Sequence, residues 1–460
     1  MATIVIPSTL KEITYNAFSG CKQLKTIINF SQLTLEEGSK DNGQIAYYAN
    51  RIRNVTDGYI ENNCVLGAAD TVNVLCAYLG NETELVLPAN YKGEKYIIDY
   101  SVFQNKTNLT TITIPSSVTD IRDRAFYGCK NLKTIYNFSE LVLSRRSKSY
   151  GEIGYYALTV INAPNGSIEN DYVFSVVDGV NILSAYIGNE AELILPANYR
   201  GENYTIGNRA FVGYSRLTSV SIPNSVTGIG SSAFYNCSNL SSITLPTNLN
   251  KIGSEVFYGC TKLASIEIPD GVTEIGSGAF EGCSSLTSVT IPDGVTEISS
   301  RAFEGCSSLT SVTLPKNLTE IGISAFASCL KLPIIIIPNT VTEIGSSAFN
   351  ACYLKTVVNF SNLVFSRDST NYGLIAYNVP RVINAPNGCV ENDYVFGVVD
   401  GENKLFGYIG NEKEITLPAY YNGENYMIAP EAFYKHHSLT SVTLPNTVTE
   451  ISESAFCKCI

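Results

Sequence analysis

Apolar and polar positions alternate in short stretches that return along the chain with a fixed spacing. The segment Leu286–Val295 reads LTSVTIPDGV, and its inward positions are Leu286, Val289, Ile291 and Val295. The alternation within SVTI predicts a strand, and the VTEI that follows predicts a second short extended stretch. The next segment, SSRAFEGC, predicts a corner with one helical turn that carries a phenylalanine and a cysteine into the core.

The phenylalanine of this corner marks the period. From Phe211 to Phe349 every step between consecutive copies is 23, two further pairs keep the same step, and the other three steps are 85, 85 and 84. Proline returns with the same spacing, which suits a strand end where the ladder needs no further N–H donor. The phenylalanines are Phe18, Phe103, Phe126, Phe211, Phe234, Phe257, Phe280, Phe303, Phe326, Phe349, Phe433 and Phe456.

A unit of this length is too small to bury its own apolar face, so successive copies are expected to stack around one continuous core. Strands stacked about 4.8 Å apart would place neighbouring coils in the same surroundings. That explains why residues 268–290 and 291–313 differ at only two positions. We therefore predict one continuous solenoid over residues 1–460, mostly β, with short helical or 3-10 turns.

The repeated phrase IPxxVTxIGxxAFxxCxxLxxVx resembles the BspA-like leucine-rich repeat, which is common in surface proteins of host-associated bacteria and of some parasitic protozoa. The resemblance covers all twelve units that the phenylalanines mark. It implies a leucine-rich-repeat solenoid with a right-handed superhelix, export to the cell surface, and adhesion to host or microbial proteins. No ligand contacts are general to the family, so the resemblance assigns no binding residue.

Three of the steps contain long insertions, because a step of 84 or 85 is far longer than the plain step of 23. In the second insertion, two strand-like stretches flank Asp178-Gly179, a turn signal typical of a β-hairpin. We therefore expect three β-hairpin-bearing insertions. The predicted super-repeats are residues 7–114, 115–222 and 338–444, the plain repeats are 223–337, and the insertions occupy about 28–84, 136–192 and 358–414.

Each insertion begins with a strand whose sixth position is asparagine, at Asn29, Asn137 and Asn359. A buried amide must be hydrogen-bonded, so these residues are interpreted as structural.

Tyrosine gathers in the insertions and provides candidate partner-binding residues, because its ring is large, rigid and amphipathic. The alternative is that the rings cover the core. In the second copy the candidates are Tyr155, Tyr156, Tyr172, Tyr186, Tyr199 and Tyr204. Two more candidates, Ile334 and Ile336, would face outward from a strand and form an exposed apolar patch, unless the adjoining insertion covers them.

Charge and composition narrow the classes of partner. The net charge of −11 argues against nucleic acid, and no apolar run is long enough for membrane insertion. Nine of the 13 cysteines occupy one position of the repeat, which predicts a ladder of buried, reduced thiols rather than a metal site. They are Cys21, Cys129, Cys237, Cys260, Cys283, Cys306, Cys329, Cys352 and Cys459; Cys64, Cys76, Cys389 and Cys457 lie off the ladder.

A second ladder is acidic, and it is interpreted as a solvated outer face, with a stripe that collects cations such as Ca²⁺ as the alternative. Its members are Glu12, Asp120, Glu274, Glu297, Glu320, Glu343 and Glu450.

Catalytic signals are weak. The two histidines, His436 and His437, are adjacent at a corner, and neither a glycine-rich phosphate loop nor an H-E-x-x-H motif occurs. The sequence predicts no enzyme, no catalytic or metal-binding residues and no cofactor.

Two functions remain. The first is a secreted or cell-surface binding and adhesion module that recognises an extracellular protein or glycan of host or microbe; the second is a structural spacer that displays another domain of a longer surface protein. The chain starts and ends inside the repeated phrase and lacks a signal peptide, so we expect a fragment of an exported protein. The end rungs are expected to allow end-to-end or edge self-association.

Overall fold

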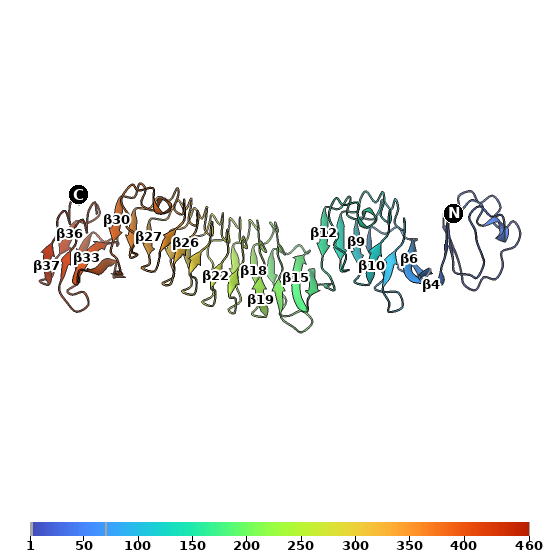
Figure 1. Ribbon diagram of the computed structural model, residues 1–460, viewed down its shortest axis with the longest axis horizontal. Helices are drawn as coiled ribbons and strands as arrows, with labels where there is room; N and C mark the ends of the chain where they lie inside the picture. Colours follow the sequence, from blue (N-terminus) through green and yellow to red (C-terminus); the bar gives the residue numbers. More distant parts are fainter. Residues whose placement is uncertain (1–2, 70, 460) are drawn as a thin grey trace. The chain divides into compact units, whose positions relative to one another are not determined.

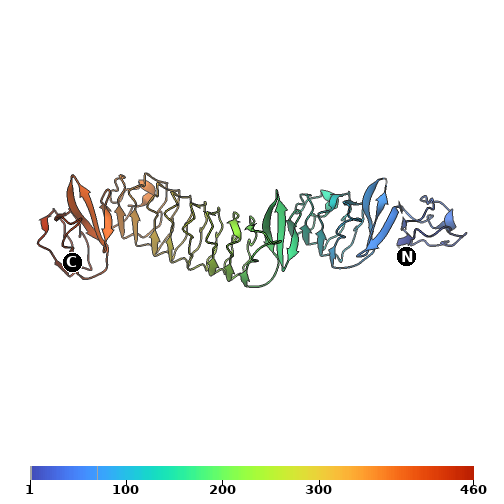
Figure 2. The ribbon, with the colours of Figure 1, turned by 90° about the horizontal axis from the view of Figure 1, so that it is seen from below.

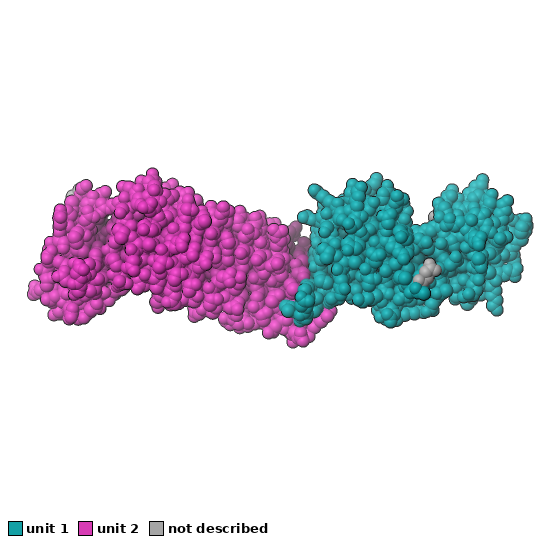
Figure 3. Space-filling view, viewed as in Figure 1, with its two compact units in different colours: residues 1–180 teal, residues 181–460 magenta. Residues whose placement is uncertain are grey.

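The computed structural model describes residues 3–69 and 71–459. The chain divides into two compact units, Met1–Val180 and Asn181–Ile460 (Figure 3). Each unit is described by itself below.

Each unit is a β-solenoid in which strands of successive coils lie side by side (Figures 1 and 2). The pairing is parallel and keeps the register of the repeat, since Ser288 pairs with Ser311 and Glu297 with Glu320. Parallel strands in register place identical sequence positions side by side, which is the arrangement that the period predicts. The predicted fold class, a mostly β repeat solenoid, is confirmed, while the handedness of the superhelix stays a prediction. The helical turn predicted for the corner at residues 299–306 is wrong, because that segment consists of turns rather than helix.

The first unit contains two parallel sheets, one mixed sheet and an antiparallel pair. In sheet order the strands are β1 (Thr3–Ile6), β2 (Thr26–Asn29) and β3 (Arg51–Asn54); β12 (Thr159–Asn162), β11 (Thr134–Asn137), β9 (Thr111–Ile114) and β7 (Glu84–Val86); β10 (Val118–Ile121), β8 (Tyr96–Ile98), β6 (Val72–Tyr78), β5 (Cys64–Ala69) and β4 (Thr56–Glu61); and β13 (Ser167–Glu169) with β14 (Tyr172–Val177).

The second unit repeats this organisation over more coils. On one side its strands are β16 (Glu192–Ile194), β18 (Ser219–Ser221) and β20 (Ser242–Thr244); β23 (Ser288–Thr290) and β25 (Ser311–Thr313); β27 (Ile334–Ile337), β29 (Thr356–Asn359) and β30 (Arg381–Asn384); and β34 (Glu414–Thr416) with β36 (Ser441–Thr443). On the other they are β15 (Val180–Tyr186), β17 (Tyr204–Ile206) and β19 (Val226–Ile229); β21 (Lys251–Ile252), β22 (Glu274–Ile275), β24 (Glu297–Ile298), β26 (Glu320–Ile321) and β28 (Glu343–Ile344); and β31 (Cys389–Glu391), β32 (Tyr394–Val399), β33 (Glu402–Tyr408), β35 (Tyr426–Ile428) and β37 (Val448–Ile451).

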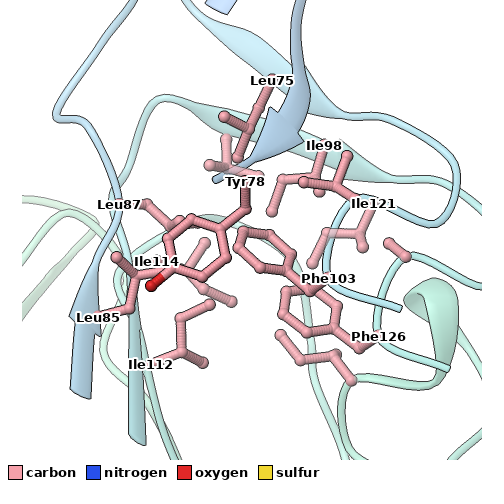
Figure 4. Close-up of a cluster of buried hydrophobic side chains, with 14 of the residues drawn as sticks. Leu75, Tyr78, Leu85, Leu87, Ile98, Phe103, Ile112, Ile114, Ile121 and Phe126 are labelled. Atoms are coloured by element: carbon pink, nitrogen blue, oxygen red, sulfur yellow. The ribbon is translucent and has the colours of Figure 1, made fainter. Parts of the chain in front are cut away.

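Stacked phenylalanine rings form the centre of the core in both units. In the second unit, the centroids of Phe280 and Phe303 are 5.2 Å apart with the rings 5° from parallel, and both side chains are fully buried. In the first unit, Tyr78 lies 5.2 Å from Phe103, which stacks on Phe126 at 4.7 Å (Figure 4). The tyrosine of the insertion thus continues the ring stack into a coil that has no phenylalanine of its own.

The cysteine ladder lies beside the ring stack. The Cys283 thiol donates to the main-chain carbonyl oxygen of Phe257, one coil earlier, at 3.2 Å, and Cys306 donates in the same way to Phe280 at 3.3 Å. Burial of a thiol costs little when its weak donor has an acceptor. The predicted ladder of buried thiols is present at six of its nine positions, but Cys21 is exposed and Cys352 and Cys459 are half-buried. The thirteen cysteines are free.

Three 3-10 helices occupy the atypical coils of the insertions: η1 (Asn42–Gln44), η2 (Tyr150–Glu152) and η3 (Tyr372–Leu374). Each contains a glycine with positive φ, such as Gly373 at φ 65°. The carbonyl of Gly373 accepts the Phe349 N–H at 2.9 Å, a bond that plain coils make with an alanine carbonyl of the next coil. The 3-10 turn therefore keeps the ladder of the corner intact where the repeat is interrupted.

The asparagines that begin the insertions are buried and hydrogen-bonded, as predicted. The amide Nδ2 of Asn359 donates to the Leu363 carbonyl and to Asn384 Oδ1, and its Oδ1 accepts bonds from the N–H and the hydroxyl of Ser361. Asn29 and Asn137 make the same set of bonds. The amides hold the first turn of each insertion against the strand of the next coil.

Antiparallel strands occur at corresponding places of the long steps. In the second unit, β32 pairs with β33 across Asp400-Gly401, and in the first unit β5 pairs with β6. In the middle copy, β14 ends and β15 begins on either side of Asp178-Gly179. The boundaries of the super-repeats and insertions, and the single continuous solenoid, stay predictions.

Candidate functional site

The candidate tyrosines differ in exposure. Tyr155 is 38% exposed, packs edge-on against Tyr156 at 4.8 Å, and has Lys148 Nζ 5.6 Å from its ring centre. Tyr155 lies at the surface of the first unit and is available to a partner, while Tyr156 beside it is half-buried. Tyr186, in the second unit, is half-buried beside Tyr214 at 5.4 Å, and its hydroxyl donates to Glu190.

The other three candidate tyrosines are core residues. Tyr172 is 7% exposed in the first unit, and Tyr199 and Tyr204 are at most 1% exposed in the second. The Tyr204 hydroxyl donates to the Pro196 carbonyl at 2.7 Å. Buried rings cannot contact a partner directly, so for these three the packing alternative describes the structure.

The apolar patch expected at Ile334 and Ile336 is partly covered. Both side chains are half-buried and pack against a cluster that includes Phe360, Ile383 and Val395. These residues belong to β30, β32 and the turn after β29, so the insertion lies over the outward face of β27. The alternative that the insertion covers this patch is the one that the structure supports.

The buried thiols have little chemical reactivity. Burial raises the pKa of Cys283 and of Cys237 to about 12, so both are protonated near neutral pH. A thiol in this state is a poor nucleophile and a poor metal ligand. Of the off-ladder cysteines, Cys64 and Cys76 are buried in the first unit, while Cys457 is exposed.

The acidic ladder is present on the outer edge of β24, β26 and β28. Glu297 pairs in register with Glu320, and Glu320 with Glu343. The pKa of Glu320 is raised, first by desolvation and then by the charges of its two neighbours. Lys251 neutralises one end of the row through an ion pair with Glu274 at 2.6 Å. No group of three or more His, Cys, Asp or Glu side chains suited to a metal ion occurs within residues 3–69 and 71–459.

A basic pocket lies in the second unit between the start of β29 and β30, the end of β33, and the corner that carries the two histidines. Its volume is about 550 Å³. The residues that line it are Pro333, Ile334, Lys355, Thr356, Pro380, Arg381, Tyr408, Ile409, Gly410, Asn411, Lys435, His436, His437 and Ser438. We call this set the basic pocket.

Arg381 is the buried basic residue of the basic pocket, with 8% of its surface exposed. Its two terminal nitrogens donate to the main-chain carbonyls of Tyr408 and Ala432, and its Nε has no hydrogen-bond partner among the described residues. Burial lowers the pKa of the guanidinium to about 10, so it stays charged at neutral pH. Arg51 occupies the same register in the first unit and bonds the carbonyls of Tyr100 and Ser101.

Sequence reasoning located the histidines of the basic pocket but not Arg381 or Lys355. The only signal in the sequence is a basic residue at the start of each of two strands, Lys355 before β29 and Arg381 in β30. The first part of the insertion separates the two residues along the chain. The proximity of the two side chains follows from the pairing of Thr356 with Arg381.

The stacked coils, the leucine-type inward positions and the ring ladder together define a leucine-rich-repeat solenoid. The sequence matches the family described as BspA type Leucine rich repeat region over residues 1–56, 83–177, 192–306, 250–372 and 402–460. The chain belongs to this family, and the membership implies a repeat module that binds protein. Among the described residues, no helix is both long enough and apolar enough to cross a membrane.

Several solved structures are similar to the chain. A leucine rich cell surface protein from Faecalibacterium prausnitzii is 31% identical, with a TM-score of 0.41, over 65% of this chain and 81% of that one. A leucine-rich repeat protein from Bacteroides ovatus is 25% identical, with a TM-score of 0.37, over 64% and 80%. The T. pallidum leucine rich repeat protein is 28% identical, with a TM-score of 0.35, over 42% and 85%. A comparison with functionally curated proteins finds no match.

Proposed function

We propose that this chain is a secreted or cell-surface binding and adhesion module that recognises an extracellular protein or glycan of host or microbe. The observation that carries the proposal is the family match, which extends over most of the chain. Repeat solenoids offer long surfaces whose side chains vary while the core stays constant, and such surfaces are used for binding.

The variation in this chain is concentrated where the repeat is interrupted. Plain coils present rows of hydroxyls, since Ser288 pairs with Ser311 and Thr290 with Thr313. A uniform row offers few distinctive contacts. The interrupted coils add the exposed Tyr155, with the half-buried Tyr156 against it, in the first unit and the basic pocket in the second. These features are therefore better candidates for contact with a ligand than the plain coils are.

The second candidate function is a structural spacer that displays another domain. The uniformity of the plain coils between residues 223 and 337 favours it, because a spacer needs stiffness and solubility rather than a specific surface. We infer no enzymatic activity in either case, since burial raises the pKa of ladder thiols such as Cys237 and Cys283 and makes them poor nucleophiles.

The test is binding of the folded chain to an array of extracellular-matrix proteins and purified glycans. A binding module should retain at least one ligand at physiological salt, and the heat-unfolded chain should lose it. Replacement of both Tyr155 and Tyr156 by serine measures the contribution of the two rings, and Tyr235→Ser, in a plain coil, is the matched control. Failure of the folded chain to retain any ligand would leave the spacer as the better account.

A further inference from the structure

The basic pocket carries a charge opposite to that of the chain around it. The chain has a formal net charge of −11, yet among the described residues that line the pocket none is acidic and five are basic. We propose that the basic pocket binds a sugar that carries a sulfate or carboxylate group. The inference rests on the proposed binding function in that it names the class of ligand.

Arg381 would be the anchor for the anionic group. Its side chain is held in one orientation by bonds to the carbonyls of Tyr408 and Ala432, and it is buried without an acidic partner. A buried charge that lacks a counter-ion is costly, and an anion that reaches it interacts more strongly than it would in water. A guanidinium also matches the planar or tetrahedral oxygen atoms of carboxylate and sulfate.

The other basic groups surround the same opening. Lys355, Lys435 and His437 are exposed at the rim, and His436 is half-buried below them. The pKa of His436 is lowered by burial, by the charge of Arg381 and by that of His437. The positive charges of Lys355, Arg381 and Lys435 repel one another, so an anion between them removes an unfavourable interaction as well as adding a favourable one.

The acidic residue that follows the pocket lining in sequence is already engaged. Glu412 follows the pocket residue Asn411, but its carboxylate accepts a hydrogen bond from the Tyr408 hydroxyl and is not part of the lining. It therefore does not neutralise the basic groups directly.

Size and lining favour a sugar over a simple inorganic ion. A volume of about 550 Å³ lies in the range of about 300–1,000 Å³ that holds small organic ligands. Pro333, Pro380 and Ile409 provide apolar surface for the face of a sugar ring. Asn411 and Ser438 provide an amide and a hydroxyl that can bond ring hydroxyls.

The corresponding place in the first unit carries a longer side chain. Lys106 takes the position of His436, and its Nζ donates to the Gly80 carbonyl at 2.7 Å while lying 4.8 Å from the centre of the Tyr78 ring. His436 is shorter, and its Nδ1 lies 3.2 Å from Ser438 Oγ instead. The side chain at this corner of the basic pocket thus differs between the two copies.

The experiment is titration of the full chain with glucose 6-sulfate, glucuronic acid, glucose and inorganic sulfate, followed by NMR. Both acidic sugars should bind at least about tenfold more tightly than glucose or sulfate alone, and higher salt should weaken them. The double variant Lys435→Ala with His437→Ala changes only exposed side chains and should weaken binding about tenfold. Lys262→Ala, an exposed lysine of a plain coil, should leave it unchanged.

Several results would overturn the proposal. Equal binding of glucose, equal binding of inorganic sulfate, or an unchanged affinity in the double variant would each do so. Binding of an acidic peptide in place of both sugars would assign the pocket to a protein ligand instead. The same measurements separate this proposal from the proposed adhesion function. If the double variant keeps its array ligand but loses the sugars, the adhesion surface lies outside the basic pocket. If the wild-type chain binds the sugars but no array ligand, the adhesion function is refuted while the sugar site stands.

Discussion

Substitution of Gly373 by alanine tests whether the 3-10 coil of the insertion is a close-packed part of the solenoid. Gly373 has φ 65° and ψ 27°, a left-handed conformation in which alanine is disfavoured by about 1–2 kcal/mol. A Cβ at this position would lie 2.4 Å from the Gly345 carbonyl oxygen and 2.8 Å from the Ala348 nitrogen. Both atoms belong to the backbone, so the overlap with the added Cβ can be relieved only if the neighbouring coil moves.

The expected loss of stability has two parts. Strain of the left-handed conformation contributes about 1–2 kcal/mol, and overpacking against fixed backbone adds about 1–3 kcal/mol. The total is about 2–5 kcal/mol for Gly373→Ala. The matched control is Gly401→Ala, because Gly401 has φ 80° but nothing lies within 4 Å of its added Cβ. The control should lose only the first part.

The assay is urea unfolding of both variants and the wild-type chain, monitored by circular dichroism and by the emission of the tyrosines. Repeat proteins unfold with incomplete cooperativity, so midpoints are compared only between variants with equal slopes. Gly373→Ala should fall well below Gly401→Ala. Equal midpoints for the two variants would refute the close contact with Gly345, and with it the role of the 3-10 turn as a substitute for the plain corner.

Three further predictions follow from the buried groups. Asn359→Ala should lower the free energy of unfolding by about 2–4 kcal/mol, because it leaves buried partners such as Ser361 without a hydrogen bond. The control Asn425→Ala removes an exposed side chain and should change the free energy of unfolding by less than about 0.5 kcal/mol. Similar values for the two variants in urea titrations would contradict the structural role of Asn359. Burial raises the pKa of Cys283 to about 12, so its contribution to stability is present below about pH 9 and is lost as the pH rises towards 12, by about 1.4 kcal/mol per pH unit. Cys283→Ala should therefore flatten the decline of the urea midpoint between pH 8 and 10.5. An equal decline in the variant and the wild-type chain would count against this contribution of Cys283. Because the pKa of His436 is lowered, its ring gains charge only as the pH falls, so glucose 6-sulfate should bind more tightly at pH 5.5 than at pH 8, and an affinity independent of pH would exclude the ring from the site. The charged and titratable groups around that ring are Lys355, Arg381, Tyr408, Lys435 and His437.

Much of the fold follows from the sequence because every plain coil solves the same packing problem. The spacing of Phe280 and Phe303 predicts that their rings stack, and the spacing of Cys283 and Cys306 predicts the thiol ladder beside them. The asparagines were predictable for a different reason. A polar residue at an inward position of a strand must find hydrogen bonds within the fold.

The candidate site was less predictable, because the insertions do not repeat the plain pattern. Tyrosine is equally suited to a surface and to a core, so composition alone did not separate the exposed Tyr155 from the buried Tyr199 and Tyr204. The alternation of the strand predicts that Ile334 faces outward, but the residues that partly cover its side chain belong to the insertion.

By itself, the sequence determined the period, the inward positions and the stacking of like on like, since these depend on contacts between neighbouring coils that share one pattern. Only the tertiary structure decided which tyrosines are buried, and that Lys355, Arg381 and the two histidines surround one opening. Those relations join residues from different coils and from an insertion. Their distances depend on how the inserted chain folds back over the solenoid, which no local pattern of apolar and polar residues specifies.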